Sequence, residues 1–127
     1  MIADARNADL LAEWADSIEN DGTKEAFLLL VGAASALRSM TCHPQFKGTI
    51  RDFRFIDTNG EQPFSFITNK SSLLFYFRPP SVRSGAYAFD RLKAAFESAS
   101  TNPKGEWTVR LESIDDVQRL RRYLELR

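Results

Sequence analysis

The chain has 127 residues, with 17 acidic and 17 basic side chains and a hydrophobic share of 43%. This length is typical of one domain, and the hydrophobic share is too high for a disordered chain. A neutral net charge argues against a protein that coats DNA non-specifically, because such proteins carry a basic excess. The longest apolar run, residues 26–31, is far shorter than the ~20 residues of a membrane helix. We therefore expect one folded domain over residues 1–127 that makes no membrane contact.

The chain has a single cysteine, Cys42, which cannot form an internal disulfide. The N-terminal segment also lacks the basic-then-apolar layout of a secretory signal, because Asp4, Asp9 and Glu13 interrupt it. Both observations favour a reducing, cytoplasmic setting.

Charge is unevenly distributed along the chain. Residues 1–25 contain seven acidic and two basic side chains, a balance of −5, so residues 26–127 carry +5. We weigh two roles for the acidic segment. It either stabilises the fold by lying near the chain's own arginines, or it offers a surface to a basic partner.

Two helices are predicted before the first strand. Apolar residues between Leu10 and Ile18 recur at spacings of three and four, which indicates an amphipathic helix over residues 3–19. Thr23 is a suitable N-cap for a second helix, from residue 24 to about residue 40. This helix should end before Pro44, because the residue that precedes a proline disfavours the α conformation.

Residues 49–78 predict a three-stranded antiparallel meander that is rich in phenylalanine. The strands are expected at residues 49–57, 63–68 and 72–78. The Asn59-Gly60 pair at the first turn supplies the positive φ angles of a tight hairpin. Seven of the ten phenylalanines lie in or beside this segment. Because side chains alternate along a strand, we expect one face of phenylalanine rings and one mixed face.

The last third of the chain predicts a helix, a strand and a second helix. After a polar loop over residues 81–85, an apolar stripe indicates a helix over residues 87–99. Alternating apolar residues then indicate a strand over residues 106–112. Ser113 is a suitable N-cap for a final helix over residues 114–126. A right-handed crossover would place the fourth strand parallel to the third.

Together these elements predict an α+β fold with two N-terminal helices, a three-stranded antiparallel meander and a helix-strand-helix unit. The four strands would form one mixed sheet. No linker or internal repeat divides the chain, which favours a single domain.

Cys42 and His43 are the only cysteine and the only histidine, and they are adjacent. One interpretation is a thiolate–imidazole pair, which would make the protein an enzyme. Adjacent side chains seldom face each other, and we can name no third group to orient them. We therefore favour a helix exit that contains a small apolar cysteine. Two adjacent ligands do not match the spacings of zinc sites either, so we predict no catalytic residue, no metal and no cofactor.

The mixed face of the predicted sheet carries the best candidates for binding. Arginines beside a tyrosine ring can hold phosphate while a base stacks on the ring, as in single-strand binders. The same face carries Ile56, Ile67 and Leu74, so the N-terminal helices could cover it, or it could be an ordinary solvated surface. The candidate binding residues are Arg54, Tyr76, Arg78 and Arg110 on strands, with Lys70 and Arg83 in nearby loops.

The C-terminal half resembles a small bacterial domain of unknown function that is found alone or beside nucleases. The resemblance is carried by FITNK at residues 66–70, LLFYF at residues 73–77 and WTVRLESIDD at residues 107–116. That domain also ends in a strand, a short Ser/Asp junction and an amphipathic helix. The resemblance implies a compact α+β module with a link to nucleic-acid processing or defence. It carries no catalytic residue onto this chain.

We predict that the protein is a small, non-catalytic binding module of bacterial or phage type that acts through protein–protein contact, as inhibitor, immunity and accessory proteins do. The chain is neutral overall, but residues 1–25 are acidic and residues 26–127 are basic. This separation of charge suits electrostatic pairing with a protein. The first alternative is a nucleic-acid-binding module that uses the arginine and tyrosine face. The second is an enzyme that uses Cys42 and His43. The identity of the partner and the oligomeric state stay open.

Overall fold

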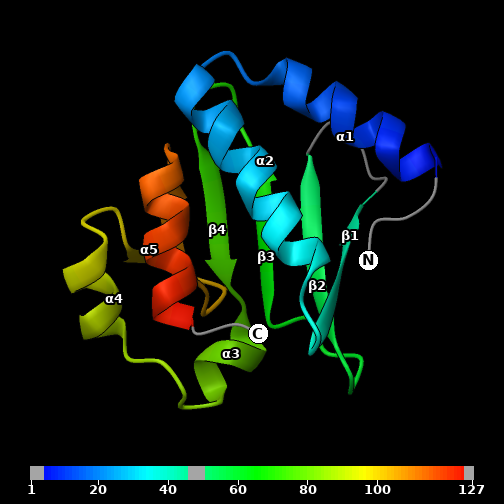
Figure 1. The fold of residues 1–127 in the computed structure, drawn as a ribbon. Coiled ribbons are helices and arrows are strands. Elements are labelled where there is room, and N and C mark those ends of the chain that lie inside the picture. The colour runs from blue at the N-terminus through cyan, green and yellow to red at the C-terminus, as the bar shows by residue number, and fades with distance from the viewer. Residues whose placement is uncertain (1–4, 46–50, 125–127) are drawn as a thin grey trace.

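In the computed structural model the described residues are 5–45 and 51–124, with side chains described from residue 11 onward. These residues form an α+β fold of five helices and six strands (Figure 1). In chain order the elements are α1 (Ala5–Ser17), α2 (Asp21–Ser35), β1 (Met40–Pro44), β2 (Asp52–Asp57), β3 (Phe64–Thr68), β4 (Leu73–Phe77), α3 (Pro79–Arg83), α4 (Phe89–Ala95), β5 (Ser100–Thr101), β6 (Trp107–Leu111) and α5 (Ile114–Leu124).

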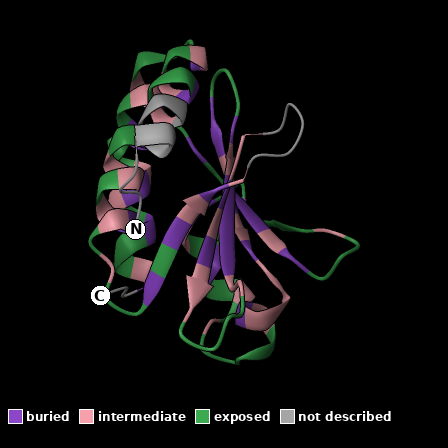
Figure 2. Cartoon of the chain, turned by 90° about the vertical axis from the view of Figure 1, so that its right-hand side faces the viewer, coloured by how far each residue is buried: buried purple, intermediate pink, exposed green. Residues whose placement is uncertain are grey.

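The strands form one antiparallel sheet in the order β1-β2-β3-β4-β6-β5. Helices α2 and α5 lie next to each other in front of this sheet in Figure 1, with α1 beyond one end of α2. An edge-on view shows the long helices on one side of the strands (Figure 2). The sheet therefore has a face covered by helices and a face that these helices leave open.

The covered face is built from phenylalanine. The register aligns Phe53 with Phe66 and Phe66 with Phe75, so the rings form rows across neighbouring strands. Each of six sheet phenylalanines is at most 3% exposed, and burial of one such side chain contributes ~1.5–3 kcal/mol to stability. The six are Phe53, Phe55, Phe64, Phe66, Phe75 and Phe77. The predicted alternation of a phenylalanine face with a mixed face is confirmed.

The chain turns after β2 at the Asn-Gly pair, as predicted, but the connection to β3 spans residues 58–63 and is longer than a tight hairpin. Gly60 has a φ of +79°, a backbone conformation that residues other than glycine rarely adopt. The backbone N–H of Gly60 donates to the Asp57 carbonyl at 3.1 Å, and the Asp57 carboxylate accepts from the backbone N–H of Asn59. The local sequence thus fixes this turn.

The predicted helix over residues 24–40, with its N-cap at Thr23 and its exit at Cys42 and His43, is wrong at both ends. Its N-cap is Asn20, whose side chain accepts from the backbone N–H of Thr23. Helix α2 ends at Ser35, and Met40–Pro44 forms the edge strand β1. The five residues alternate, with Met40, Cys42 and Pro44 buried on the covered face. A proline is tolerated here because an edge strand need not donate every backbone N–H to the sheet.

The predicted sheet is also wrong in size and direction. It has six strands instead of four, it is antiparallel instead of mixed, and its consecutive meander contains four strands instead of three. The chain between β4 and β6 forms two short helices, α3 and α4, followed by β5. Strand β5 then turns back into β6 through Gly105, whose φ is +77°. This extra reversal makes β6 antiparallel to β4, so the predicted right-handed crossover is absent.

Several element bounds also differ from the sequence-based expectation. Residues 81–85 were expected to be a loop, but most of them belong to α3. The helix expected over residues 87–99 is reduced to Phe89–Ala95. Parts of three expected elements, at residues 3–4, 49–50 and 125–126, lie outside the described residues.

Candidate binding surface

The sheet face opposite the helices, which we call the open face, carries a row of polar side chains. The register aligns one residue from each of five neighbouring strands. In order across the sheet these residues are His43, Arg54, Ser65, Tyr76 and Thr108. The idea that the N-terminal helices cover this face is wrong, because Trp14 and Phe27 of those helices contact Phe53 on the other face.

Arg54 is held in place on the open face by two neighbours. Its Nε lies 2.7 Å from Oδ2 of Asp52, two residues earlier on the same strand face. Its Nη1 donates to Oε1 of Gln62 at 3.3 Å. The side chains of Arg54 and Asp52 are 28% and 14% exposed, so the ion pair is partly shielded from water and the arginine is well ordered.

Arg78 repeats this arrangement at the end of β4. Its Nε lies 3.5 Å from Oε2 of Glu106, and its Nη1 donates to the backbone carbonyl of Gln62 at 3.1 Å. Glu106 is only 8% exposed, and its other oxygen accepts from the side-chain amide of Asn102. Gln62 thus accepts hydrogen bonds from both arginines and links them into one network.

Tyr76 lies in the polar row between Ser65 and Thr108. Burial raises the pKa of its hydroxyl, and the nearby carboxylates of Glu106 and Asp52 raise it further. The hydroxyl therefore stays protonated at neutral pH and can donate a hydrogen bond. Beside the row, Ile67 and Leu74 face each other across β3 and β4, and both are half-buried.

The other predicted binding residues lie outside this row. Arg110 is exposed on β6 opposite Leu74, at the margin of the open face. Lys70 lies in the turn between β3 and β4, where its Nζ is 3.8 Å from Oε1 of Glu19 at the helix end of the molecule. Arg83 lies in the last turn of α3 and is exposed. The structure therefore brings Arg54, Tyr76 and Arg78 together and places Arg110 beside them, but not Lys70 or Arg83.

Sequence reasoning missed the groups that hold the two arginines. Asp52 was detectable, because the Asp-x-Arg spacing puts both side chains on one face of a strand. Gln62 and Glu106 both lie outside the strands. Gln62 comes 16 residues before Arg78, and Glu106 comes 28 residues after it. No local pattern signals such a contact, since it depends on which strands become neighbours.

Cys42 and His43 do not form the thiolate–imidazole pair. Successive side chains of a strand point to opposite faces, so Cys42 is buried among the phenylalanines and His43 lies on the open face. Burial raises the pKa of the Cys42 thiol to about 12, so it stays protonated. Burial also lowers the pKa of His43, whose Nε2 lies 2.9 Å from the hydroxyl of Thr41.

Neither a metal site nor a membrane helix is found among the described residues. In the described part of the chain no three His, Cys, Asp or Glu side chains are grouped to hold a metal ion. None of the helices described there is long and apolar enough to cross a bilayer. The chain matches no family model, no curated protein and no solved structure. The resemblance of the C-terminal half to a small bacterial domain stays a prediction.

Proposed function

We propose that the chain is a small, non-catalytic module that binds a protein partner through the open face of its sheet. The observation that carries this proposal is the layout of that face. Ile67 and Leu74 form a half-buried apolar pair between Asp52 and Arg110 in the register. Tyr76 lies next to this pair, and the ion-paired Arg54 and Arg78 lie on the Tyr76 side of it. Protein interfaces combine an apolar centre with a polar rim, and tyrosine and arginine are the residues that most often supply binding energy there.

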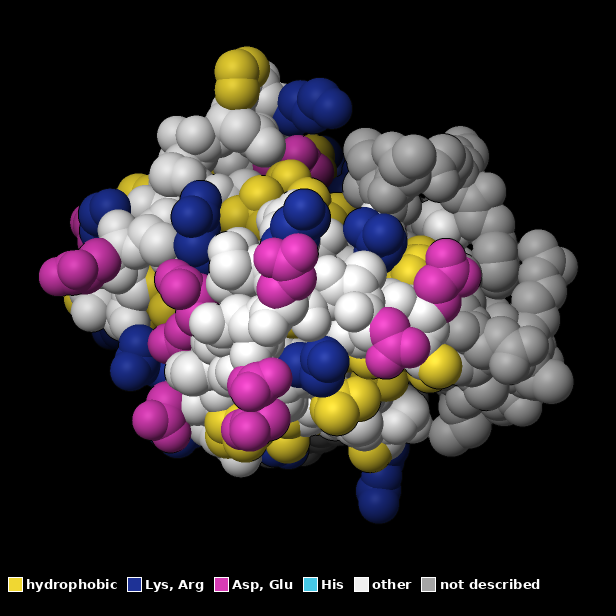
Figure 3. Space-filling model, turned by 90° about the horizontal axis from the view of Figure 1, so that it is seen from above, with side chains coloured by type: hydrophobic (Ala, Val, Ile, Leu, Met, Phe, Trp, Pro, Cys, Tyr) yellow, Lys and Arg dark blue, Asp and Glu magenta, His cyan; other side chains and the backbone are white. Residues whose placement is uncertain are grey.

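The ion pairs favour a protein over a nucleic acid as the partner. Arg54 and Arg78 each already hold a carboxylate, within 2.7 and 3.5 Å respectively. A phosphate group would have to displace Asp52 and Glu106 and would be repelled by them. Elsewhere, the end of the molecule seen in Figure 3 shows acidic and basic side chains interspersed, with no patch of one sign. A nucleic-acid surface normally shows such a patch.

The network around Gln62 supports an inhibitor, immunity or accessory type of module in particular. Each arginine is fixed by a carboxylate and by an oxygen of Gln62, so it loses little side-chain freedom when a partner docks. Such preorganisation lowers the entropic cost of binding. A rigid sheet that carries oriented arginines is therefore suited to tight, specific contact with a protein.

A pair of matched variants tests this proposal. Leu74→Arg places a charge in the apolar centre of the open face, and Leu28→Arg places the same charge on α2, where Leu28 is 58% exposed. Tagged wild-type and variant proteins are used to capture partners from a lysate of the source organism, and captured proteins are quantified by mass spectrometry. We expect a partner that Leu28→Arg retains and that Leu74→Arg loses by about tenfold or more, as for a central interface residue. Calorimetry with the purified partner then measures the two affinities directly.

The wild-type protein and the variant Arg110→Ala test the nucleic-acid alternative. Fluorescence anisotropy with single- and double-stranded oligonucleotides at low salt should show no binding that depends on Arg110. Binding that weakens steeply with salt and that Arg110→Ala removes would favour a nucleic-acid module instead. If every captured protein is recovered equally with Leu74→Arg and Leu28→Arg, the open face is not the docking surface.

A further inference from the structure

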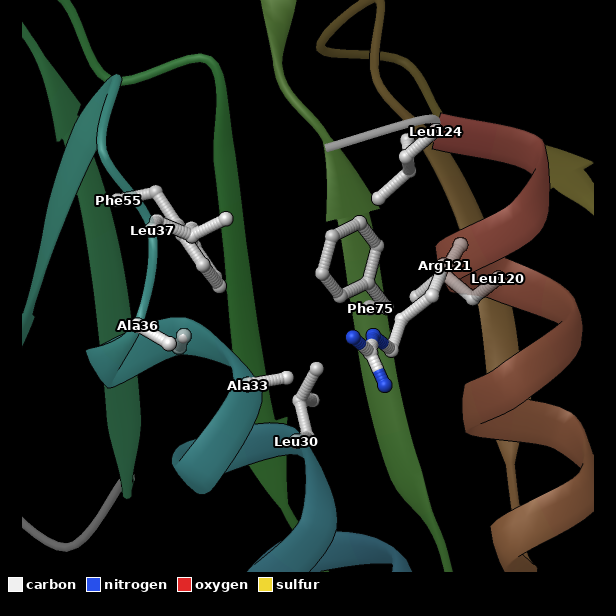
Figure 4. Close-up of a pocket in the computed structure, with 10 residues that line it drawn as sticks. Leu30, Ala33, Ala36, Leu37, Phe55, Phe75, Leu120, Arg121 and Leu124 are labelled. Carbon is white, nitrogen blue, oxygen red and sulfur yellow. The ribbon is translucent and has the colours of Figure 1, made fainter. Parts of the chain in front are cut away.

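An apolar cavity of about 180 Å³ lies on the helix side of the sheet, between α2 and α5. Phe55 and Phe75 form its floor (Figure 4). Ala33 and Leu30 of α2 line one side, and Leu124 of α5 lines the other. The cavity is separated from the open face by the sheet itself.

Small side chains on α2 create this space. Ala33 and Ala34 face α5 across the cavity, and neither extends beyond its Cβ. The space is open to solvent on the side where the exposed Ala36 and Arg121 lie. An apolar cavity of ~150 Å³ in a protein core is enough to bind benzene, whereas sites for drug-sized ligands measure roughly 300–1,000 Å³. The volume here therefore suits one six-membered ring or an acyl chain of similar size.

Among the described residues that line this apolar cavity, Arg121 is the one charged side chain, and it is exposed at the cavity rim. Figure 4 shows that it extends from α5 into the space between the helices, toward Leu30. One of its nitrogens donates to Oε1 of Gln118 at 3.1 Å. Among the described residues no carboxylate lies within 4.0 Å of it, unlike Arg54 and Arg78. A guanidinium group has five N–H donors, so most of its capacity to bind an anion is unused.

We propose that this cavity binds a small carboxylic acid that has one ring or an equally short acyl chain. The apolar part lies on Phe55 and Phe75, and the carboxylate accepts hydrogen bonds from Arg121. Planar guanidinium groups match carboxylates in a two-pronged geometry that a lysine cannot supply. Among the described residues that line the cavity, none is acidic and would repel this ligand. The inference is independent of the proposed protein-binding face.

The competing ligand class is an apolar cation. Helix α5 is described as far as Leu124, and the C-terminal part of a helix carries a partial negative charge of roughly half a unit. Arg121 outweighs this partial charge because it carries a full positive charge and has no carboxylate partner among the described residues. Three probes that share a benzyl group but differ in charge separate the two classes. They are phenylacetate, benzyl alcohol and benzylamine.

Isothermal titration calorimetry on the full chain measures the affinity for each probe. We expect phenylacetate to bind about tenfold more tightly than benzyl alcohol, which is the effect of one charge-assisted hydrogen-bonded pair. Benzylamine should bind most weakly. Equal affinities for the three probes, tighter binding of benzylamine, or no detectable binding of phenylacetate would each overturn the proposal.

Three variants then locate the site. Arg121→Gln should weaken phenylacetate about tenfold and leave benzyl alcohol unchanged, because it keeps the side chain polar but removes the charge. The control Arg122→Gln changes the next residue of α5, which is exposed and does not line the cavity, and should change neither affinity. Ala33→Leu fills the cavity and should remove binding of both probes. If Ala33→Leu does not fold, the contrast between Arg121→Gln and Arg122→Gln still decides. Identical phenylacetate affinities in those two variants would refute the assigned role of Arg121.

Discussion

Thr23 is the polar residue whose replacement best tests how the helices are joined to the sheet. It is completely buried in the first turn of α2. Its hydroxyl donates to the backbone carbonyl of Ser71 at 2.9 Å and lies 3.4 Å from the carbonyl of Glu112. One side chain thereby connects α2 to the turn between β3 and β4 and to the end of β6.

Thr23→Val removes the hydroxyl group and keeps the shape. The Ser71 carbonyl is then left without its donor in a contact that is partly buried, which costs ~1–3 kcal/mol. Threonine and valine have similar helix propensities, so the helix itself contributes little to the difference. For 127 residues the entropy of unfolding is ~0.27 kcal/mol per degree, so we expect Tm to fall by ~4–11 °C.

Thr23→Ser is the matched control, because it keeps the hydroxyl group and removes the methyl group. Loss of one buried methyl costs ~1 kcal/mol. Urea unfolding followed by circular dichroism gives the free energy of unfolding of each variant. We expect the cost of Thr23→Val to exceed that of Thr23→Ser. If the serine variant is the less stable of the two, the Thr23 hydroxyl does not join these elements, and the residue stabilises the fold mainly through the packing of its methyl group.

Three further predictions concern the core, two glycines and the buried thiol. Phe75→Ala should lower the free energy of unfolding by ~3–5 kcal/mol in urea titrations, because the ring is 1% exposed and a cavity remains. Gly60→Val should destabilise by ~1–2 kcal/mol because of the positive φ, whereas Gly32→Ala, with open space around the added carbon, should stabilise α2 by ~0.5–1 kcal/mol. The Cys42 thiol has a pKa raised to about 12 in the fold, against ~8.5 in an unfolded chain. The folded state thus keeps a proton that the unfolded state loses, so stability should fall as pH rises from ~9 toward 12, and Cys42→Ala should lack this part of the pH dependence.

Each of these predictions has a clear opposing result. A Phe75→Ala cost below ~1 kcal/mol would mean that the ring is not enclosed as described. An unchanged Tm for Gly60→Val would show that the turn does not need a left-handed residue. Rapid labelling of native Cys42 by a thiol reagent at mild alkaline pH would show that the thiol is not buried.

The sequence predicted the two faces of the sheet because their signal is local. Alternation with period two is visible in Phe53 and Phe55, in Phe64 and Phe66, and again across β4. The Asn59-Gly60 turn is equally local, since its backbone geometry depends on one residue type. The Ser113 cap belongs to the same group, because its hydroxyl accepts from the backbone N–H of Asp116 three residues later.

Strand β1 was missed although its residues alternate. The sequence around it follows a helix whose last residues, Gly32 to Ser35, are small and carry no stop signal. Leu37 and Met40 continued the helical spacing, and five residues are too few to overrule it. The strand forms because β2 offers a free edge with Phe55 opposite Cys42, and no local pattern contains that fact.

The interactions on the open face show the same limit more sharply. Sequence could place Arg54, Tyr76 and Arg78 on one face, but it could not tell whether their charges were paired. Arg78 meets Glu106 only because β6 lies beside β4 in the antiparallel direction. With the predicted parallel arrangement the start of β6 would lie at the opposite end of β4, and Arg78 would have no such partner. The strand direction therefore decides whether the charge of Arg78 is paired.

The acidic N-terminal segment and the arginines of the open face lie on opposite sides of the sheet. Trp14 of α1 packs edge-on against Phe53, with ring centroids 4.9 Å apart, and that ring belongs to the covered face. Of the ion pairs in the described residues, the pair between Glu19 and Lys70 alone involves the acidic segment, at 3.8 Å between two exposed side chains. Such a pair contributes less than ~1 kcal/mol. Among the described side chains, ion pairing between the acidic segment and the basic residues therefore adds little to the stability of the fold.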